Sequence, residues 1–227
     1  MVKPSGEQML TIIVPTLNAA HALPRTLAAC AEMHALEHIV VDGGSIDETR
    51  ALAMCLGARV ITAPPGRGTQ LAAGAAAARG DWLLFLHADS CPAPGWAAVA
   101  RARMADPARA HYFRFALDDP APQARRLERL VAWRCRTLAL PYGDQGLLIA
   151  RTLYGDVGGY RPLPLMEDVD LVRRLGRRRL KALPVPVITS AERWRRDGWT
   201  GRSARNLVCL ALWFLGVPPR AIRRLYG

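Results

Sequence analysis

The sequence predicts an α/β domain with a mainly parallel central sheet, and three observations support that prediction. Four short apolar segments alternate with helical segments over residues 10–89. Polar residues follow each apolar segment, as they do at the ends of buried strands. The 227 residues are 51% hydrophobic and 22% charged, which excludes disordered and fibrous classes.

The expected strands are short runs of apolar and β-branched residues, a composition typical of strands buried on both faces. They occupy 10–14, 38–42, 58–62 and 81–86. Because helical segments separate them, right-handed crossovers keep the strands parallel and bring their carboxyl ends to one edge of the sheet.

Three helices fill the intervals. The first covers about 22–33 and has a proline in its first turn, where a missing N–H is tolerated. The second begins near Asp47, whose charge favours the helix dipole, and ends at Gly57. The third is rich in alanine and follows the Pro- and Gly-containing loop 64–68.

Several polar side chains follow these strands at the edge where ligands bind in such sheets. They are Thr16, Asn18, Asp42, Arg67, Gln70, His87 and Asp89. Since they come from four separate segments and are expected to converge, they predict a binding site.

The charge is unevenly distributed. Residues 1–110 hold nine basic and nine acidic side chains, whereas residues 111–227 hold 22 basic and ten acidic ones and carry the whole net charge of +12. The excess of arginine over lysine is typical of a GC-rich genome. It also suits an anionic partner, namely a phosphorylated substrate, nucleic acid or a membrane surface. Composition does not choose among these.

Other features exclude several classes. The five cysteines are scattered and form no C-x-x-C pair, which argues against a disulfide framework or a zinc site and favours a reducing compartment. The polar N-terminus predicts no signal peptide, and the longest apolar run, 207–217, is too short to span a membrane. We therefore expect a cytoplasmic protein. No Gly-rich dinucleotide or P-loop motif is present.

A set of motifs occurs in a fixed order along the chain. They are Val14–Asn18, Val41–Asp47, Gly66–Gln70, the strand ending at Asp89, and Met166–Leu171. In this combination the chain resembles the family 2 glycosyltransferases, which have the GT-A fold. The segments 85–89, 141–146 and 193–198 are similar, more narrowly, to a small bacterial subgroup found beside radical-SAM and selenodomain genes.

The resemblance implies a nucleotide-sugar donor, with UDP as the nucleotide. The implied contacts are Pro15, Thr16, Asn18, Asp42, Arg67, Gln70, Asp89 and Arg193. The carboxylate of Asp42 would accept hydrogen bonds from the base or ribose, and the alternative is a turn-forming acid. Arg67 would reach the phosphates, against the alternative of a solvated loop arginine.

The resemblance also implies a divalent cation, Mn²⁺ or Mg²⁺, beside the diphosphate. Asp89 stands in the Asp-x-Asp position of the family, and His87 replaces the usual first aspartate. Imidazole suits Mn²⁺ better than Mg²⁺. Whether His87 touches the metal, the ribose or only the core is open at this point.

Glu167 and Asp168 open a helix that we expect to continue to about residue 175. The family places its general base on the aspartate of this pair, so the resemblance assigns Asp168 as base and Glu167 as its neighbour. Acids at a helix N-terminus are also stable without any catalytic role. By resemblance Asp144, Gln145 and Trp194 contact the acceptor, with a plain turn and internal packing as the alternatives.

The expected organisation is a catalytic domain over 1–200, with a nucleotide-binding half (1–110) and an acceptor half (111–200), followed by a helical tail (201–227). The tail is apolar over 206–215 and carries arginines between 202 and 224. We prefer a buried or dimer-forming helix, and the alternative is peripheral contact with the inner face of a membrane.

The resemblance implies an inverting, metal-dependent glycosyltransferase, which we expect to act on a small or lipid-linked hydroxyl acceptor and to bind no nucleic acid. One alternative is a nucleotidyltransferase of related fold, which would need a Gly-rich, Arg-containing loop after the first strand; residues 15–18 are not such a loop. The other is a non-catalytic protein that binds polyanions or a membrane surface through its basic half.

Overall fold

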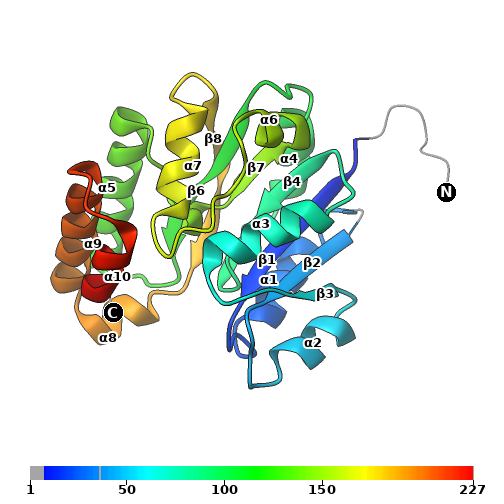
Figure 1. Ribbon diagram of the computed structural model, residues 1–227, viewed down its shortest axis with the longest axis horizontal. Helices are drawn as coiled ribbons and strands as arrows, with labels where there is room; N and C mark the ends of the chain where they lie inside the picture. The colour runs from blue at the N-terminus through cyan, green and yellow to red at the C-terminus, as the bar shows by residue number, and fades with distance from the viewer. Residues whose placement is uncertain (1–7, 36, 227) are drawn as a thin grey trace.

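The computed structural model describes residues 8–35 and 37–226, without the side chains of Arg193 and Tyr226. A single sheet with strand order β3-β2-β1-β4-β7-β6-β8-β5 forms the centre (Figure 1). Its strands are β1 (Leu10–Thr16), β2 (Glu37–Asp42), β3 (Arg59–Thr62), β4 (Trp82–Phe85), β5 (Ser90–Pro92), β6 (Ala110–Leu117), β7 (Leu147–Ala150) and β8 (Leu180–Thr189).

The first half of the sheet is parallel, as predicted. Strand β1 pairs in parallel with β2 and β4, and β2 pairs in parallel with β3. Beyond β4 the sheet is mixed, because β7 runs antiparallel to both β4 and β6, while β6 and β8 are parallel. The α/β architecture is confirmed, and antiparallel strands enter only after β4.

Helices flank the sheet on both faces. They are α1 (Leu23–Cys30), α2 (Thr49–Cys55), α3 (Arg67–Ala77), α4 (Trp96–Arg103), α5 (Pro122–Leu138), α6 (Arg151–Asp156), α7 (Glu167–Leu175), α8 (Glu192–Asp197), α9 (Trp199–Phe214) and α10 (Pro219–Tyr226), with a 3₁₀ turn, η1, at Gly143–Gln145. Figure 1 shows α3 and α7 crossing in front of the sheet, with α5, α9 and α10 gathered at the side away from α2 and β3.

The core lies between the central strands and these helices. All seven residues of β1 are buried, in agreement with a strand covered on both faces. Helix α3 packs very close to the sheet at Gly74, where an added Cβ would lie 2.4 Å from Cγ2 of Ile13. This close approach holds the start of α3 near the ends of β1 and β2.

The tail differs from the preferred prediction of burial. In α9 only Arg202, Cys209 and Leu210 are buried, and Leu207 and Leu215 are 62% and 80% exposed. Apolar composition predicted a buried helix, but α9 lies at the edge of the molecule and covers the core with one face only. Among the described residues, no helix is both long and apolar enough to cross a membrane.

Candidate functional site

The predicted site residues meet at the edge of the sheet where β1, β2 and β4 end. Helices α3 and α7 begin at the same edge, with Arg67 and Glu167 as their first residues. The turn η1 completes the edge, just before β7. Segments that are far apart in the sequence therefore supply neighbouring polar side chains.

Asp42 builds the turn after β2. Its side chain is fully buried, and its carboxylate accepts hydrogen bonds from the N–H groups of Gly44 and Ser45, each at 3.0 Å. The hydroxyls of Ser45 and Thr16 also donate to it. Burial acts to raise the pKa of Asp42, but the hydrogen bonds from Ser45, Gly44 and Thr16 outweigh it and lower the pKa.

These four hydrogen bonds show that Asp42 shapes the turn after β2. Its predicted contact with the base or ribose stays a prediction. Sequence reasoning missed Ser45, whose spacing three residues after the aspartate is the pattern of a turn closed by a side chain.

Asn18 and Pro15 position the loop after β1. Asn18 has a left-handed backbone (φ 51°), accepts a hydrogen bond from the N–H of Ile46 at 2.9 Å, and donates its own N–H to Ser45. Pro15 lies inside β1 opposite Val41. The loops after β1 and β2 are thereby fastened to each other beside the exposed edge.

Gln70 is buried, and its amide group braces the two strands. Its Nε2 donates to the carbonyl oxygens of Thr16 and Val41, each at 2.8 Å. Both amide hydrogens are thus used within the protein. The structure thus gives Gln70 a bracing role that the sequence did not indicate, and its predicted contact with the base or phosphates stays a prediction.

Arg67 connects the two helix starts and the end of β4. Its Nε lies 3.3 Å from Oε1 of Glu167, and its NH1 lies 3.3 Å from Nε2 of His87. Because a guanidinium only donates, Nε2 of His87 is the acceptor in this contact. The predicted metal role of His87 stays a prediction.

Glu167 is 3% exposed, so its carboxylate is held in a poorly solvated place. Burial raises the pKa of Glu167 to about 7; Arg67 opposes this shift and Asp168 adds to it. The carboxylate therefore holds Arg67 in place and is no freely accessible base.

Asp168 is half-buried and lies against η1. Its Oδ2 accepts a hydrogen bond from the N–H of Gly143 at 2.7 Å. A Cβ added at Gly143 would lie 2.7 Å from Nε2 of His87 and 3.3 Å from Oδ2 of Asp168. The lack of a side chain at Gly143 thus lets the imidazole, the carboxylate and the turn meet.

Asp144 and Asp89 supply two further carboxylates. Burial raises the pKa of Asp144 to about 6; Arg134 and Arg67 lower it, whereas Asp168 and Asp89 raise it. Oδ1 of Asp144 is buried and has no hydrogen-bond partner among the described groups, and no described residue donates a hydrogen bond to the carboxylate of Asp89. These oxygens suit a hard cation.

A complete metal cage is absent from the described part of the chain, where no group of three or more His, Cys, Asp or Glu side chains is placed to hold an ion. The carboxylates of Asp89 and Asp144 would provide only part of a coordination shell. Such a partial set fits an ion whose remaining ligands come from a substrate and water.

Gln145 is buried behind the site. Its Nε2 donates to the carbonyl of Phe113, and its Oε1 accepts from NH2 of Arg134 at 3.3 Å and from Cys135 at 3.2 Å. Gln145 thus makes internal hydrogen bonds, and its predicted acceptor contact stays a prediction.

Arg134, on α5, is a further charged residue of the site, and the sequence did not indicate this position. Its guanidinium carbon lies 3.4 Å from the ring centroid of Tyr142, and it adds positive charge beside Asp144. The position depends on how α5 packs across the sheet, so the sequence around it carries no signal for this role.

Trp194 packs internally. It is 8% exposed and lies against Phe115, with ring centroids 6.1 Å apart, and Arg202 stacks on it. These contacts favour the alternative of internal packing, and the predicted acceptor contact of Trp194 stays a prediction. Arg193 belongs to α8, but its side chain lies outside the described residues, so its predicted contact with the diphosphate stays a prediction.

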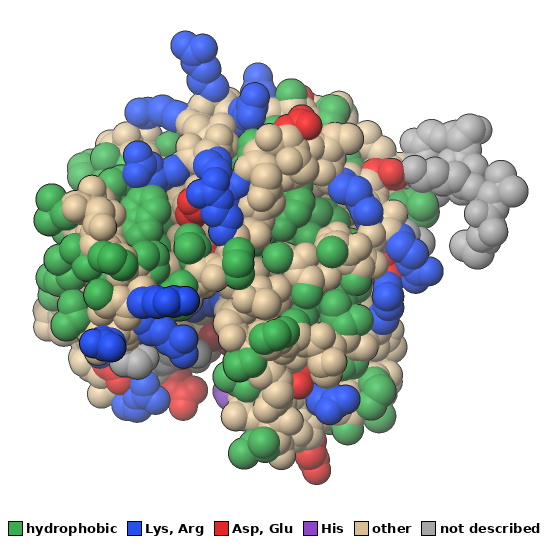
Figure 2. All heavy atoms as spheres, in the orientation of Figure 1, with side chains coloured by type: hydrophobic (Ala, Val, Ile, Leu, Met, Phe, Trp, Pro, Cys, Tyr) green, Lys and Arg blue, Asp and Glu red, His purple; other side chains and the backbone are tan. Residues whose placement is uncertain are grey.

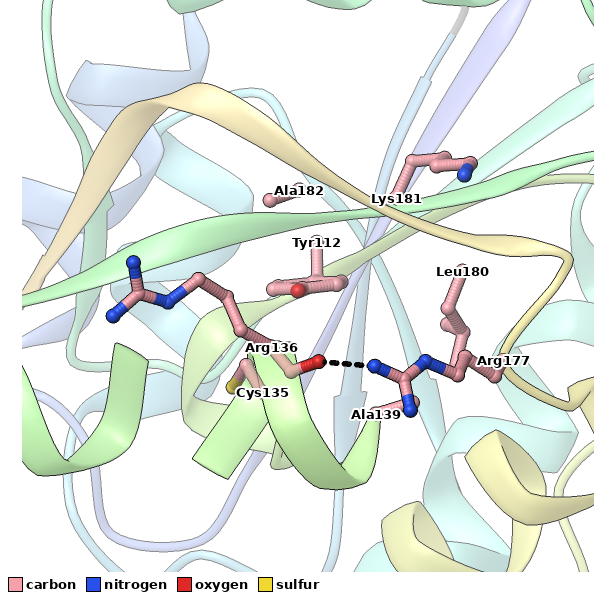
Figure 3. A pocket seen from close by; sticks show the side chains of 8 residues that line it. All are labelled: Tyr112, Cys135, Arg136, Ala139, Arg177, Leu180, Lys181 and Ala182. Carbon is pink, nitrogen blue, oxygen red and sulfur yellow. Dashed lines mark hydrogen bonds between the residues drawn. The ribbon is translucent and has the colours of Figure 1, made fainter. Parts of the chain in front are cut away.

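The hollows of the molecule are small at this edge. A cavity of about 10 Å³ adjoins Asp168, Gly143 and Tyr160. A larger pocket of about 170 Å³ lies elsewhere, at the end of α5 (Figure 3). There Arg177 donates to the carbonyl of Arg136, so its charge stabilises the C-terminus of α5. The larger pocket contains none of the predicted site residues.

Two mycobacterial proteins are similar in sequence to part of this chain. A "PGL/p-HBAD biosynthesis glycosyltransferase" from Mycobacterium bovis is 41% identical over 90 residues, which span 36% of this chain and 35% of that protein. A protein of the same name from Mycobacterium tuberculosis matches equally. The match therefore spans about a third of the length of these relatives.

Solved structures share the fold. Glucosyl-3-phosphoglycerate synthase from Mycobacterium tuberculosis, in complex with Mn²⁺, UDP and glucosyl-3-phosphoglycerate, superposes with a TM-score of 0.61 at 18% identity and covers 96% of this chain and 87% of its own. S. aureus TarS 1–349, in complex with UDP-GlcNAc, has a TM-score of 0.62 at 17% identity over 80% of this chain and 58% of its own. The GT-A-like fold is thus confirmed.

A family model provides the broadest sequence match. The model described as "Glycosyl transferase family 2" matches residues 11–162, which is more than half of the chain. The matched range includes the ends of β1, β2 and β4, α3 and the turn η1, which together form most of the site. The protein therefore belongs to glycosyl transferase family 2.

Proposed function

We propose that the protein transfers a sugar, with inversion, from a UDP-sugar to a hydroxyl acceptor with the help of a divalent cation. The observation that carries this proposal is the position of Asp168, whose carboxylate lies at the edge of the sheet beside the charged groups around Asp144. Family membership supports sugar transfer over the nucleotidyltransferase and the non-catalytic binder.

The donor would lie over the loops that follow β1 and β2. Asp42 and Asn18 hold these loops rigid, so their exposed backbone groups form a fixed surface for a nucleotide. Arg67, held by Glu167, is placed for the diphosphate because a guanidinium fork matches phosphate oxygens. Complexes of the fold relatives with UDP or UDP-GlcNAc support the choice of UDP.

A divalent cation fits the charge of the site. The carboxylates of Asp89, Asp144, Glu167 and Asp168 face the guanidinium groups of Arg67 and Arg134, which leaves two excess negative charges when all are ionised. Asp89 and Asp144 would hold the ion, and fold relatives contain Mn²⁺ or Mg²⁺. When bound, the ion would neutralise charge on the departing diphosphate.

Asp168 would act as the general base. The N–H of Gly143 fixes its Oδ2, so the carboxylate is oriented before the acceptor arrives. The acceptor proton would pass to Asp168 as the hydroxyl oxygen attacks the anomeric carbon and the diphosphate leaves from the opposite face. That in-line geometry produces inversion.

The acceptor half would comprise 111–200, with the nucleotide half over 1–110 and the tail over 201–227. The mycobacterial relatives are named for PGL/p-HBAD biosynthesis and one fold relative binds glucosyl-3-phosphoglycerate, so both lipid-linked and small anionic acceptors deserve testing. The narrower resemblance to the radical-SAM-associated subgroup stays a prediction, as does a cytoplasmic location.

Thermal shift with UDP tests the donor side. UDP with Mn²⁺ should raise the melting temperature, and UDP with EDTA should raise it much less, because the ion joins protein and diphosphate. Donor hydrolysis across a panel of nucleotide-sugars then identifies the sugar. Equal shifts with and without Mn²⁺, or a response to GDP and none to UDP, would contradict the proposal.

A further inference from the structure

Helix α9 exposes an uninterrupted apolar stripe. The stripe consists of Ala204, Leu207, Val208, Ala211, Phe214 and Leu215. These positions recur every three or four residues and therefore lie along one face of the helix. Leu207, Val208, Phe214 and Leu215 are 62%, 53%, 47% and 80% exposed. No charged residue interrupts this face.

Helix α10 adds positive charge beside the stripe. Ile222 is fully buried and anchors the helix, whereas Arg220, Arg223, Arg224 and Leu225 are exposed. Neither α9 nor α10 contains an acidic residue, and no ion pair joins these three arginines to an acid in the described part of the chain. Figure 2 shows apolar side chains gathered on this side of the molecule, with basic side chains next to them.

We propose that this surface, defined as the exposed side chains of α9 and α10 and called the docking surface below, binds the face of an anionic lipid bilayer. Apolar side chains of this size bury themselves at the boundary between headgroups and acyl chains. Arginines beside them pair with lipid phosphates near an anionic surface. The docking surface offers both features within two consecutive helices.

The charge decides between a bilayer and a second copy of the chain. A two-fold contact between two docking surfaces would gather the arginines of both copies in one interface, where α9 and α10 offer no carboxylate to pair with them. An anionic bilayer complements both the arginines and the apolar stripe. The bilayer is therefore the occupant that the observations favour.

The docking surface is firmly attached to the catalytic domain. The guanidinium of Arg173, on α7, stacks on Trp213 and Phe214 of α9 at 5.3 and 5.0 Å from their ring centroids. Asp197, at the end of α8, pairs with Arg202 and Arg205 in the first turns of α9. Binding at the docking surface would thus hold the whole domain at the membrane.

Co-sedimentation with vesicles tests the proposal. The full chain should bind vesicles of phosphatidylcholine with 30 mol% phosphatidylglycerol much more tightly than vesicles of phosphatidylcholine alone, and salt should weaken the binding. The double variant Leu207→Asp/Leu215→Asp should bind at least about tenfold more weakly. The matched control Met54→Asp/Leu56→Asp changes two exposed apolar residues, 59% and 47% exposed, at the far side of the molecule and should bind like the unmodified chain.

The arginines require a second comparison. The triple variant Arg220→Gln/Arg223→Gln/Arg224→Gln should lose most of the preference for anionic vesicles. The control Arg50→Gln/Arg101→Gln/Arg178→Gln removes the same charge from other exposed positions and should keep it. Thermal melting of each variant checks that the fold is intact.

Three results would overturn the proposal. They are equal binding to neutral and anionic vesicles, equal loss in the variants and their controls, and a dimer in light scattering that disappears with Leu207→Asp/Leu215→Asp while vesicles are not bound. Because vesicle binding needs no donor or acceptor, its outcome is independent of the proposed transfer reaction.

Discussion

Arg67 and Glu167 join the first turns of α3 and α7, with Nε of Arg67 lying 3.3 Å from Oε1 of Glu167. Glu167 is 3% exposed, while the Arg67 side chain is 37% exposed and reaches the open edge of the site. A buried carboxylate thus fixes an arginine whose other side faces the expected diphosphate. The helices pack closely here, since a Cβ added at Gly68 would lie 2.3 Å from the carbonyl oxygen of Arg161.

Replacing Glu167 with glutamine should stabilise the protein at neutral pH. The pKa of Glu167 is about 7 against an ordinary value of 4.5, so the unfolded chain ionises first and the native state loses stability as pH rises from 4.5 to 7. Above pH 7, Glu167→Gln should gain up to roughly 3 kcal/mol in the free energy of unfolding. Urea denaturation at pH 5 and pH 8 measures the difference; a variant less stable than the unmodified chain at pH 8 contradicts it.

The substitution Gly143→Ala should impair transfer without unfolding the protein. The new Cβ would meet Nε2 of His87 at 2.7 Å, which forces the imidazole away and disturbs its contact with Arg67. We expect kcat to fall at least about tenfold. Gly201→Ala, where an added Cβ meets nothing within 4 Å, is the matched control. Equal activity of the two variants would show that the close approach has no role in catalysis.

Gln70→Leu should destabilise the edge of the sheet. The substitution removes the donor that satisfies the buried carbonyls of Thr16 and Val41, at a cost of about 1–3 kcal/mol. Equilibrium unfolding in urea gives the change. Gln123→Leu, on the exposed face of α5, controls for the loss of an amide. If Gln70 instead contacts the nucleotide directly, the variant will keep its stability and lose donor affinity.

His111 should make the protein sensitive to acid. It is 3% exposed, neither ring nitrogen has a hydrogen-bond partner among the described groups, and burial followed by repulsion from Arg103 lowers its pKa to about 4. The unfolded chain therefore takes up the proton first, and stability is lost as pH falls from 6.5 towards 4. Through His111 alone, the free energy of unfolding should fall by about 3 kcal/mol over this pH range.

The variant His111→Leu should not lose this part of its free energy of unfolding in acid. Its stability should fall less between pH 7 and pH 4 than that of the unmodified chain, as measured by urea denaturation at several pH values. Parallel curves for the two proteins would mean that His111 does not titrate in this range.

The first half of the fold was predictable because its signals are local. Strands β1, β2 and β4 each contain a short run of buried apolar residues, and α7 begins at Glu167 and ends at Leu175 as expected. The parallel pairing of β6 with β8 was not predictable, since it joins segments about seventy residues apart. Nothing in their local sequences indicates that they pair or in which register. Their association depends on the packing of the whole second half.

The site was predictable in its location and less so in its individual contacts. Strand ends identified the edge where Arg67, His87 and Asp168 meet. The sequence did not reveal that the amides of Gln70 and Gln145 turn inward, because both satisfy carbonyl groups of distant strands. An amide that binds a ligand and one that braces a strand look alike in a sequence.

The most direct test of the proposed mechanism is single-turnover transfer by Asp168→Asn with UDP affinity measured on the same sample. Asparagine keeps the size of the side chain and can still accept the hydrogen bond from Gly143, but it cannot take up the acceptor proton. We expect the transfer rate to fall at least about a hundredfold while UDP binding in Mn²⁺ stays within about twofold. Transfer at more than a tenth of the unmodified rate would contradict the assignment of Asp168 as the general base.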